Sequence, residues 1–161
     1  MQFSPEFRLL LQLLNVKLGN RNDYELQQSI RQISSWERFV ALVIRHRLVS
    51  LVYTLVVELN IQLTENAYAR LKNQVDLERK KNFILNASLI QLNEVLEKEI
   101  DVLWFKGVVQ SQRMYNNSLL RSYSDLDLYI KKSDLNRLDE LLRAQGYMPT
   151  LDWKTYSDHL H

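Results

Sequence analysis

The sequence predicts an α+β protein, with a helical lobe over residues 1–100 followed by a smaller mixed unit over residues 101–161. The first observation is the uneven distribution of glycine and proline. Only Gly19 and Pro5 precede residue 100, and the other three glycine and proline residues follow it. The second observation is hydrophobic spacing, which is helical in the first part and changes to short apolar runs in the second. The third is a content of 46% hydrophobic and 25% charged residues, which is typical of a folded globular protein.

The first helices are predicted from apolar spacing and from a capping signal. Apolar residues from Phe3 to Leu14 recur at helical spacing, and Gly19 is the expected stop. Ser34, with Glu37 three residues later, predicts a capping box at the start of a helix that carries Trp36.

Two further helices complete the predicted lobe. An apolar helix is expected from about residue 49 to residue 59. Thr64 is the expected cap of a long helix whose leucines at 85, 89, 92 and 96 keep three- and four-residue spacing. We expect this last helix to deliver the chain to the second unit.

The second unit begins with a short strand and a turn. The run VLWF, residues 102–105, is apolar and β-prone, and Lys-Gly follows it at once. This order predicts a buried strand that turns at Gly107 into a helix over about residues 108–115.

Two more strands and a helix are predicted after that turn. RSYSDLDLYI, residues 121–130, has the pattern of a second strand. Ser133 is the expected cap of a helix that stops at Gly146, and YMPTL, residues 147–151, is expected to open a third strand. The whole unit is therefore predicted to be a small α/β or α+β core with a mixed sheet.

Two carboxylates share one face of the expected second strand. Because strand side chains alternate, Asp125 and Asp127 are expected about 6.6 Å apart on one face, and Leu126, Leu128 and Ile130 on the other. Two ionised carboxylates repel each other, so they need a cation, a basic partner or open water. Magnesium takes oxygen ligands from one or two carboxylates and leaves positions for substrate phosphates. A solvated polar face is the alternative, and the pattern alone does not exclude it.

The turn before this strand offers a place for an anion. In WFKGVV, a helix N-terminus follows the strand, and Gly107 would let a phosphate approach the backbone N–H groups closely. An anion site before a dicarboxylate strand is the combination that a metal–triphosphate complex requires. A tight connection without a ligand is the alternative for a single glycine.

These residues resemble a family of uncharacterised nucleotidyltransferases within the DNA polymerase β superfamily. The helical preface is similar too, with Trp36 near a helix start and His46 ten residues later. In the family, a Lys-Gly closes the first strand, a helix ends near a Tyr, an Arg precedes the Asp-x-Asp strand, and a later helix ends in Gly-Tyr. The corresponding residues here are Lys106-Gly107, Tyr115, Arg121, Asp125-Leu126-Asp127 and Gly146-Tyr147.

The resemblance implies a nucleotidyltransferase that uses magnesium and a nucleoside triphosphate, expected to be ATP. It implies that Asp125 and Asp127 are catalytic ligands of one or two magnesium ions, and that Gly107 presents its N–H to the β- and γ-phosphates. The acceptor is unidentified and is a small molecule, a protein or RNA. The other implied nucleotide contacts are Lys106, Arg121 and Ser124, whose alternative roles are an exposed lysine, an arginine paired with an aspartate and a serine that ends a turn.

Two departures from the family pattern bear on catalysis. The superfamily usually has Gly-Gly or Gly-Ser at the phosphate turn, whereas this chain has Lys106-Gly107-Val108. Catalytic members use a third carboxylate from a later strand, and the later candidates here are Asp152 and Asp158. We therefore expect a partial core without the third acid. A non-catalytic nucleotide-binding or protein-interaction module on the same fold stays open, as does a domain whose aspartates simply face water.

Composition narrows the remaining function classes. No apolar run approaches the roughly 20 residues of a membrane span, and no signal peptide is recognised at the start, so a cytoplasmic protein without a membrane partner is expected. The absence of cysteine is compatible with the cytoplasm. A net charge of +2 does not by itself indicate nucleic-acid binding. Oligomeric state is left open by the sequence.

Some other residues invite a functional reading for which packing is the simpler explanation. His46 is expected to have a packing role, on a helix surface or between the two lobes, rather than to touch a phosphate. The basic residues 79–81 are expected to form a solvated helix face, because no aromatic residues interleave them as in single-strand binding. Trp104 and Phe105 are expected to be core strand residues rather than base-stacking platforms.

Overall fold

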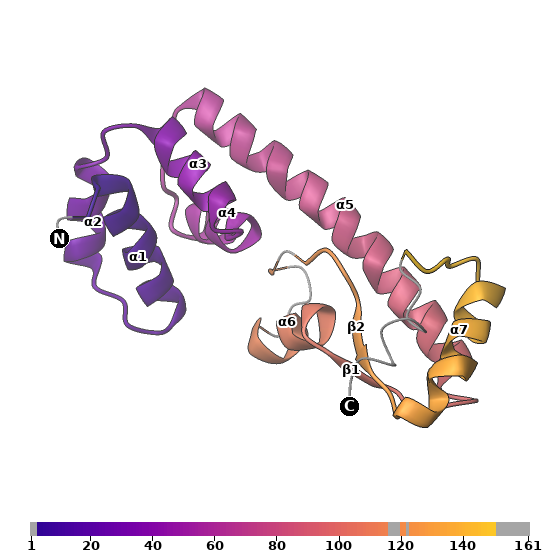
Figure 1. Cartoon of the computed structure of the whole chain (residues 1–161). Coiled ribbons are helices and arrows are strands. Elements are labelled where there is room, and N and C mark those ends of the chain that lie inside the picture. The colour runs from indigo at the N-terminus through magenta and orange to yellow at the C-terminus, as the bar shows by residue number, and fades with distance from the viewer. Residues whose placement is uncertain (1–2, 116–119, 122, 151–161) are drawn as a thin grey trace.

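The computed structural model describes residues 3–115, 120–121 and 123–150. These residues form a helical bundle, one long helix and a small two-stranded sheet flanked by two further helices (Figure 1). The arrangement confirms the α+β class and the helical preface that the sequence predicts. No helix in the described ranges combines the length and the apolar character needed to cross a membrane.

The N-terminal bundle packs around one apolar cluster. Its deepest side chains come from separate helices and include Leu9, Phe39 and Leu71, each with no exposed surface. The expected helix near residues 49–59 is confirmed, while the second helix was not predicted because its apolar residues are few. The helices are α1 (Pro5–Lys17), α2 (Asp23–Arg31), α3 (Trp36–Arg45), α4 (Val49–Glu58) and the first part of α5 (Glu65–Leu96).

Side-chain caps set the starts of α3 and α5. The Thr64 hydroxyl accepts a hydrogen bond of 3.4 Å from a backbone N–H in the first turn of α5, as predicted. The prediction for Ser34 was wrong by one residue, because Ser35 is the cap and accepts a bond of 3.2 Å from an N–H of α3. Ser34 instead donates to the carboxylate of the buried Glu6 at 2.5 Å. A tertiary contact therefore decides which of two adjacent serines begins the helix.

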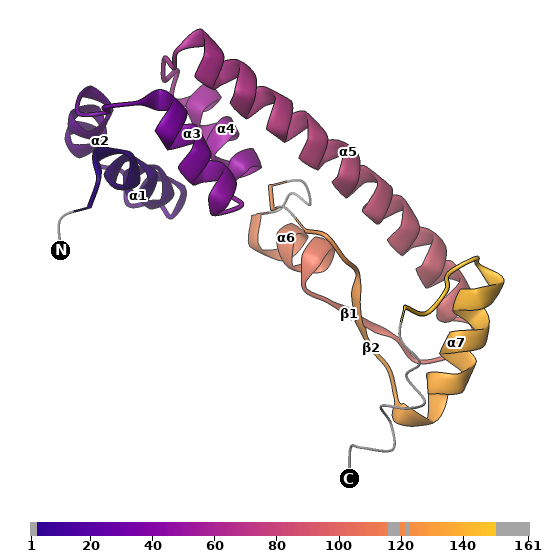
Figure 2. The same cartoon turned by 45° about the horizontal axis from the view of Figure 1, so that its top comes forward.

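The 32-residue helix α5 takes part in two hydrophobic clusters. Its first turns contribute Ala67, Leu71 and Val75 to the bundle core. Its last turns contribute Leu92 and Leu96 to a second cluster, on which the sheet and the last helix pack. The helix extends along one edge of the molecule from the bundle to the sheet (Figures 1 and 2).

The sheet consists of β1 (Leu103–Phe105) and β2 (Asp127–Tyr129), paired antiparallel. Leu103 pairs with Tyr129 and Phe105 with Asp127. Among the described residues the sheet is this antiparallel pair and not the predicted mixed sheet. Residues 147–150 do not form the predicted third strand, and residue 151 lies outside the described residues. Pro149, which lacks an N–H donor, and the helix stop just before this segment explain its irregular backbone.

Helix α6 (Gly107–Tyr115) follows β1, and α7 (Leu135–Ala144) follows β2 after a short 3₁₀ turn, η1 (Lys132–Asp134). Ser133 does not cap α7 as predicted, because η1 makes Asp134 the cap residue and Ser133 donates to it. Gly146, with a φ of 84°, ends the helix as predicted. The N–H of Gly146 bonds to the carbonyl of Arg143 and that of Tyr147 to the carbonyl of Leu142, a Schellman motif.

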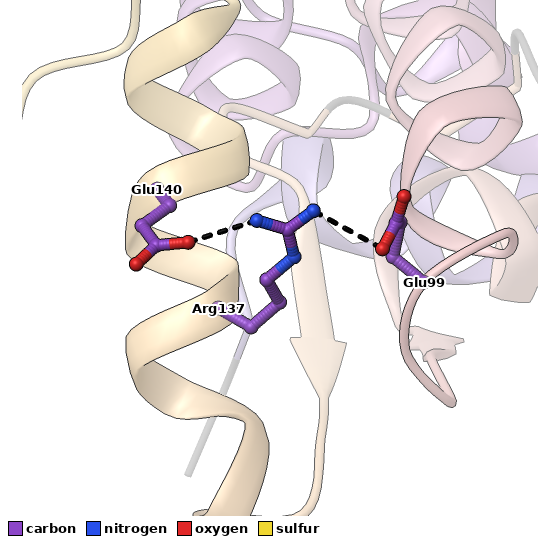
Figure 3. Close-up of polar contacts among 3 residues, drawn as sticks. All are labelled: Glu99, Arg137 and Glu140. Atoms are coloured by element: carbon purple, nitrogen blue, oxygen red, sulfur yellow. Dashed lines mark hydrogen bonds and ion pairs between the residues drawn. The ribbon is translucent and has the colours of Figure 1, made fainter.

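An arginine attaches α7 to the segment that follows α5. The Arg137 guanidinium donates to Glu140 one turn later at 2.8 Å and to Glu99 at 3.1 Å (Figure 3). Beneath these exposed pairs, Leu138 packs on the end of α5. The apolar contact therefore supplies most of the stabilisation, and the ion pairs fix the orientation of α7.

Candidate functional site

The turn between β1 and α6 has an unusual backbone. Lys106 and Gly107 have positive φ angles of 56° and 38°. Such angles cost a residue with a side chain roughly 1–2 kcal/mol, so Gly107 relieves strain at its own position and Lys106 does not. The Lys106 carbonyl accepts the first hydrogen bond of α6, from Gln110 at 3.0 Å. The turn thus directs the chain from the strand straight into a helix N-terminus.

Gly107 is buried against the segment that carries the carboxylates. A Cβ atom on Gly107 would lie 3.5 Å from the backbone oxygen of Asp125 and 3.8 Å from the Tyr123 side chain. These are ordinary contacts, so the positive φ, and not lack of space, selects glycine here. The turn and the Asp-x-Asp segment are therefore direct neighbours in the fold.

The two carboxylates have different environments. Asp127 begins β2 opposite Phe105, and its side chain is 30% exposed. The Lys106 ammonium lies 4.0 Å from one Asp127 oxygen. Asp125 is exposed in the bend that precedes the strand. The predicted strand over residues 121–130 was too long, so strand alternation applies to Asp127 and not to Asp125.

The apolar side of the predicted second strand is confirmed. Leu126, Leu128 and Ile130 pack on the second hydrophobic cluster, so Asp127 faces away from it. Trp104, opposite Leu128, packs there as well and donates its indole N–H to Asn93 of α5 at 2.7 Å.

Phe105 lies on the open face of the sheet, contrary to the core position expected for it. Its ring stacks on that of Tyr129 with centroids 4.1 Å apart, and the Lys106 ammonium lies 4.8 Å from its centroid. Pairing in register puts Phe105 and Asp127 on the same face. An aromatic pair therefore adjoins the carboxylate, and the exposure of Tyr129 reaches 59%.

Arg121 is held between two helices. Its guanidinium donates to the side-chain oxygen of Gln110 on α6, not to an aspartate, and its backbone carbonyl accepts a bond of 3.1 Å from Asn82 of α5. Ser124, directly before the bend at Asp125, is exposed. Both residues flank the Asp-x-Asp segment, but among the described residues no hydrogen bond or ion pair joins either side chain to Asp125 or Asp127.

Three supporting residues were missed by the sequence reasoning. Tyr123 is 6% exposed and donates its hydroxyl to the side-chain oxygen of Asn86 at 3.2 Å. Burial raises the pKa of this hydroxyl, which stays protonated and available as a donor. Asn82 is fully buried in the middle of α5. The available signal was two asparagines spaced by four on the inner side of a long helix, where apolar residues are the rule.

The remaining predicted residues lie elsewhere. No group of three or more His, Asp or Glu side chains suited to a metal occurs among the described residues. Asp152 and Asp158, the candidates for a third acid, lie outside these residues. His46 lies in the bundle, with its ring 6.1 Å from that of Phe7, in agreement with the packing role expected for it.

Comparison with known proteins gives one family match. A family model described as an uncharacterised nucleotidyltransferase matches residues 33–161, from the start of α3 through the turn, both carboxylates and α7. No curated protein and no solved structure matches the chain.

Proposed function

The chain belongs to the uncharacterised nucleotidyltransferase family, and from this we propose that it binds a magnesium–nucleoside triphosphate complex and transfers a nucleotidyl group to an acceptor. ATP is the nucleotide that we expect. The acceptor is a small molecule, a protein or RNA, and the absence of cysteine is compatible with a cytoplasmic location.

One observation supports the proposal more than any other. The Gly107 turn, where a helix begins, faces the Asp-x-Asp backbone, because a Cβ atom on Gly107 would lie 3.5 Å from the backbone oxygen of Asp125. The strand before the turn also pairs with Asp127. A triphosphate bound at the start of α6 would therefore have two carboxylates beside it, which is the arrangement that a shared metal ion requires.

The carboxylates fit a magnesium site in their chemistry. Magnesium is commonly bound through one or two carboxylates, with water and substrate phosphates completing its six positions, so Asp125 and Asp127 suffice as protein ligands. In this structure the Lys106 ammonium, 4.0 Å from Asp127, supplies the positive charge that the carboxylate needs. When bound, magnesium would neutralise phosphate charge and stabilise the charge that develops during transfer.

Other side chains are suited to bind the phosphates. The first turn of α6 contains no acidic residue, so nothing there repels an anion. Lys106 is 57% exposed and free to move from Asp127 to a phosphate oxygen. Arg121 would have to exchange its bond to Gln110 for a phosphate contact. We therefore assign Lys106 and Gly107 to phosphate binding before Arg121 and Ser124.

The proposed reaction is an in-line displacement at the α-phosphorus. An acceptor oxygen forms the new bond to that phosphorus, and the bond to the oxygen that bridges the α- and β-phosphates breaks. Pyrophosphate leaves with the electron pair, and the acceptor proton passes to a base. Asp152 and Asp158 are the candidates in the chain for this base.

Titration calorimetry with Mg·ATP tests the binding step. Asp127→Asn is expected to weaken binding in the presence of magnesium by on the order of tenfold or more, since it removes a charged ligand. Asp101→Asn is the matched control, because this exposed aspartate pairs with Lys131 at the start of the sheet and away from the turn. If Asp125→Asn and Asp127→Asn both bind Mg·ATP as tightly as the unchanged protein, the metal assignment is wrong.

Turnover needs a separate measurement. Nucleotides labelled at the α-phosphate are incubated with the protein and a cell extract, and label attached to an acceptor is detected together with released pyrophosphate. Transfer that depends on Asp125 supports the enzyme, whereas tight Mg·ATP binding without any transfer supports the non-catalytic nucleotide-binding module.

A further inference from the structure

The outer side of α5 carries large apolar side chains in water. Phe83 is 73% exposed, Ile84 64% and Ile90 58%. Together with the side chain of Leu77, which is 61% exposed, they extend over about four turns of the helix. A soluble surface rarely gathers so many apolar side chains in one contiguous patch without a partner.

This apolar patch lies opposite the buried side of the helix. Asn82, the buried residue in the middle of α5, and Ala87 are five residues apart and so point to nearly opposite sides. Ile84 and Ile90 are each three residues from Ala87, one on either side of it. Along the middle of α5, both views show no other element on the side away from the bundle and the sheet (Figures 1 and 2).

The small Ala87 is exposed at the centre of the patch, and an open depression lined by Arg79, Lys80, Phe83 and Ile84 lies one to two turns before it on the helix. A depression beside the projecting Phe83 and Ile84 provides the surface relief that side chains from a facing helix need for interdigitation.

Exposed charged residues lie at equal distances before and after Ala87, and the two members of each such pair have opposite charge. Lys80 lies seven residues before Ala87 and Glu94 seven residues after it. Asp76 and Lys98, each eleven residues from Ala87, repeat the relation with the signs exchanged. Two α5 helices placed antiparallel would therefore bring each Lys80 to a Glu94, and each Asp76 toward Lys98 in the turn that follows α5. Parallel helices in register would bring like charges together.

We propose that two copies of this chain associate through antiparallel α5 helices, with the two-fold axis passing beside Ala87. At the level of each Ile84 lies the Ile90 of the second copy, and the Lys80 and Glu94 pairs close the two ends. Such an interface is self-complementary, as two-fold symmetry requires. From Lys80 to Glu94 it is roughly 21 Å long, smaller than a standard protein interface, so the dimer is expected to be reversible in the micromolar range.

Sedimentation velocity of the full chain tests the dimer between roughly 1 and 300 µM, a range that brackets the affinities of weak interfaces. Lys80→Glu is expected to raise the dissociation constant about tenfold, because both symmetric ion pairs become repulsive. Glu94→Lys should do the same. The double variant Lys80→Glu with Glu94→Lys should return the constant to within about threefold of the original, because the pairs re-form with exchanged charges.

Lys72→Glu is the charge control, since Lys72 is exposed on the same helix but outside the patch. Ile84→Glu tests the apolar contact and should abolish the dimer while circular dichroism shows an unchanged helix content. A chain that is monomeric over the whole range overturns the proposal, as does a double variant that is no stronger than the single ones. Dimers that survive Ile84→Glu would place the interface elsewhere and also contradict it.

Discussion

The backbone at Lys106 provides a sensitive test of the structure around the turn. Lysine occupies a φ of 56° there, directly before Gly107. An L-residue in this region is disfavoured by about 1–2 kcal/mol, whereas glycine is not. We therefore expect Lys106→Gly to be more stable than Lys106→Ala, the reverse of the usual order in regular structure.

The magnitude follows from the terms that differ between the two variants. Both lose the ion pair to Asp127 at 4.0 Å and the contact with the Phe105 ring, each worth at most about 1 kcal/mol at this exposure. Only alanine keeps the backbone strain of about 1–2 kcal/mol, and only glycine adds about 0.5–1 kcal/mol of chain entropy in the unfolded state. The glycine variant should therefore be about 0.5–1 kcal/mol more stable, which corresponds to a Tm higher by about 2 °C.

Urea unfolding of both variants gives the free energy of unfolding directly. The same pair of substitutions at Lys72, an exposed position within α5, is the matched control, and there alanine should be more stable than glycine by about 1 kcal/mol. If alanine is also the more stable residue at position 106, the left-handed backbone at this turn is wrong, and with it the close approach of Gly107 to Asp125.

Three further outcomes are expected. Ser35→Ala should lower the free energy of unfolding by about 1 kcal/mol in urea, because the Ser35 hydroxyl caps α3 at 3.2 Å; an unchanged value would mean that another residue caps it. The hydroxyl of Ser34 lowers the pKa of Glu6 below its ordinary 4.5. The hydrogen bond between them therefore contributes stability that is present above pH 4.5 and is lost as the pH falls through the folded-state pKa of Glu6. Glu6→Gln should accordingly flatten the acid side of a plot of Tm against pH, and a plot of unchanged slope would contradict the assignment. Tyr123→Phe should cost about 1 kcal/mol in thermal or urea unfolding through the lost bond to Asn86, and no loss would show that the hydroxyl is satisfied otherwise.

The sequence predicted those features that depend on local pattern. The alternation of Leu126, Leu128 and Ile130 predicted the buried side of the second strand, and the structure confirms it. The positions of Gly107 and Gly146 predicted the turn and the helix end, because each has a positive φ that glycine accommodates.

Features that depend on a distant partner were not predictable in this way. The extent of β2 is set by its partner, which ends at Phe105, so the strand begins at Asp127 and leaves Asp125 in a bend. The cap of α3 is Ser35 because Ser34 is taken by the distant Glu6. The spacing of residues in one sequence does not show which distant residue will bind a given side chain. It also does not show where the partner strand will end the hydrogen bonding of a strand.

The candidate site also combines residues that the local sequence predicted with contacts that it did not. Lys106, Gly107, Asp125 and Asp127 were selected from the sequence, and the structure places them around one turn. Arg121 was selected as well, but its partner on α6 was not foreseen. The support from Asn82 comes from about 40 residues upstream. Its polar side chain at a buried helix position was visible in the sequence, but the carbonyl that it binds was not.

The two apolar clusters give α5 a particular place in the cooperativity of the molecule. Between Val75 and Leu92, the buried residue of this helix is the polar Asn82, so the middle turns belong fully to neither cluster. Cooperative unfolding units tend to coincide with packed clusters. The amide protons at the two ends of α5 should therefore exchange with solvent at rates set by two different opening reactions, and those near Asn82 should follow the weaker of the two. A single continuous helix would in this way report the separate stabilities of the bundle and of the unit that holds the carboxylates.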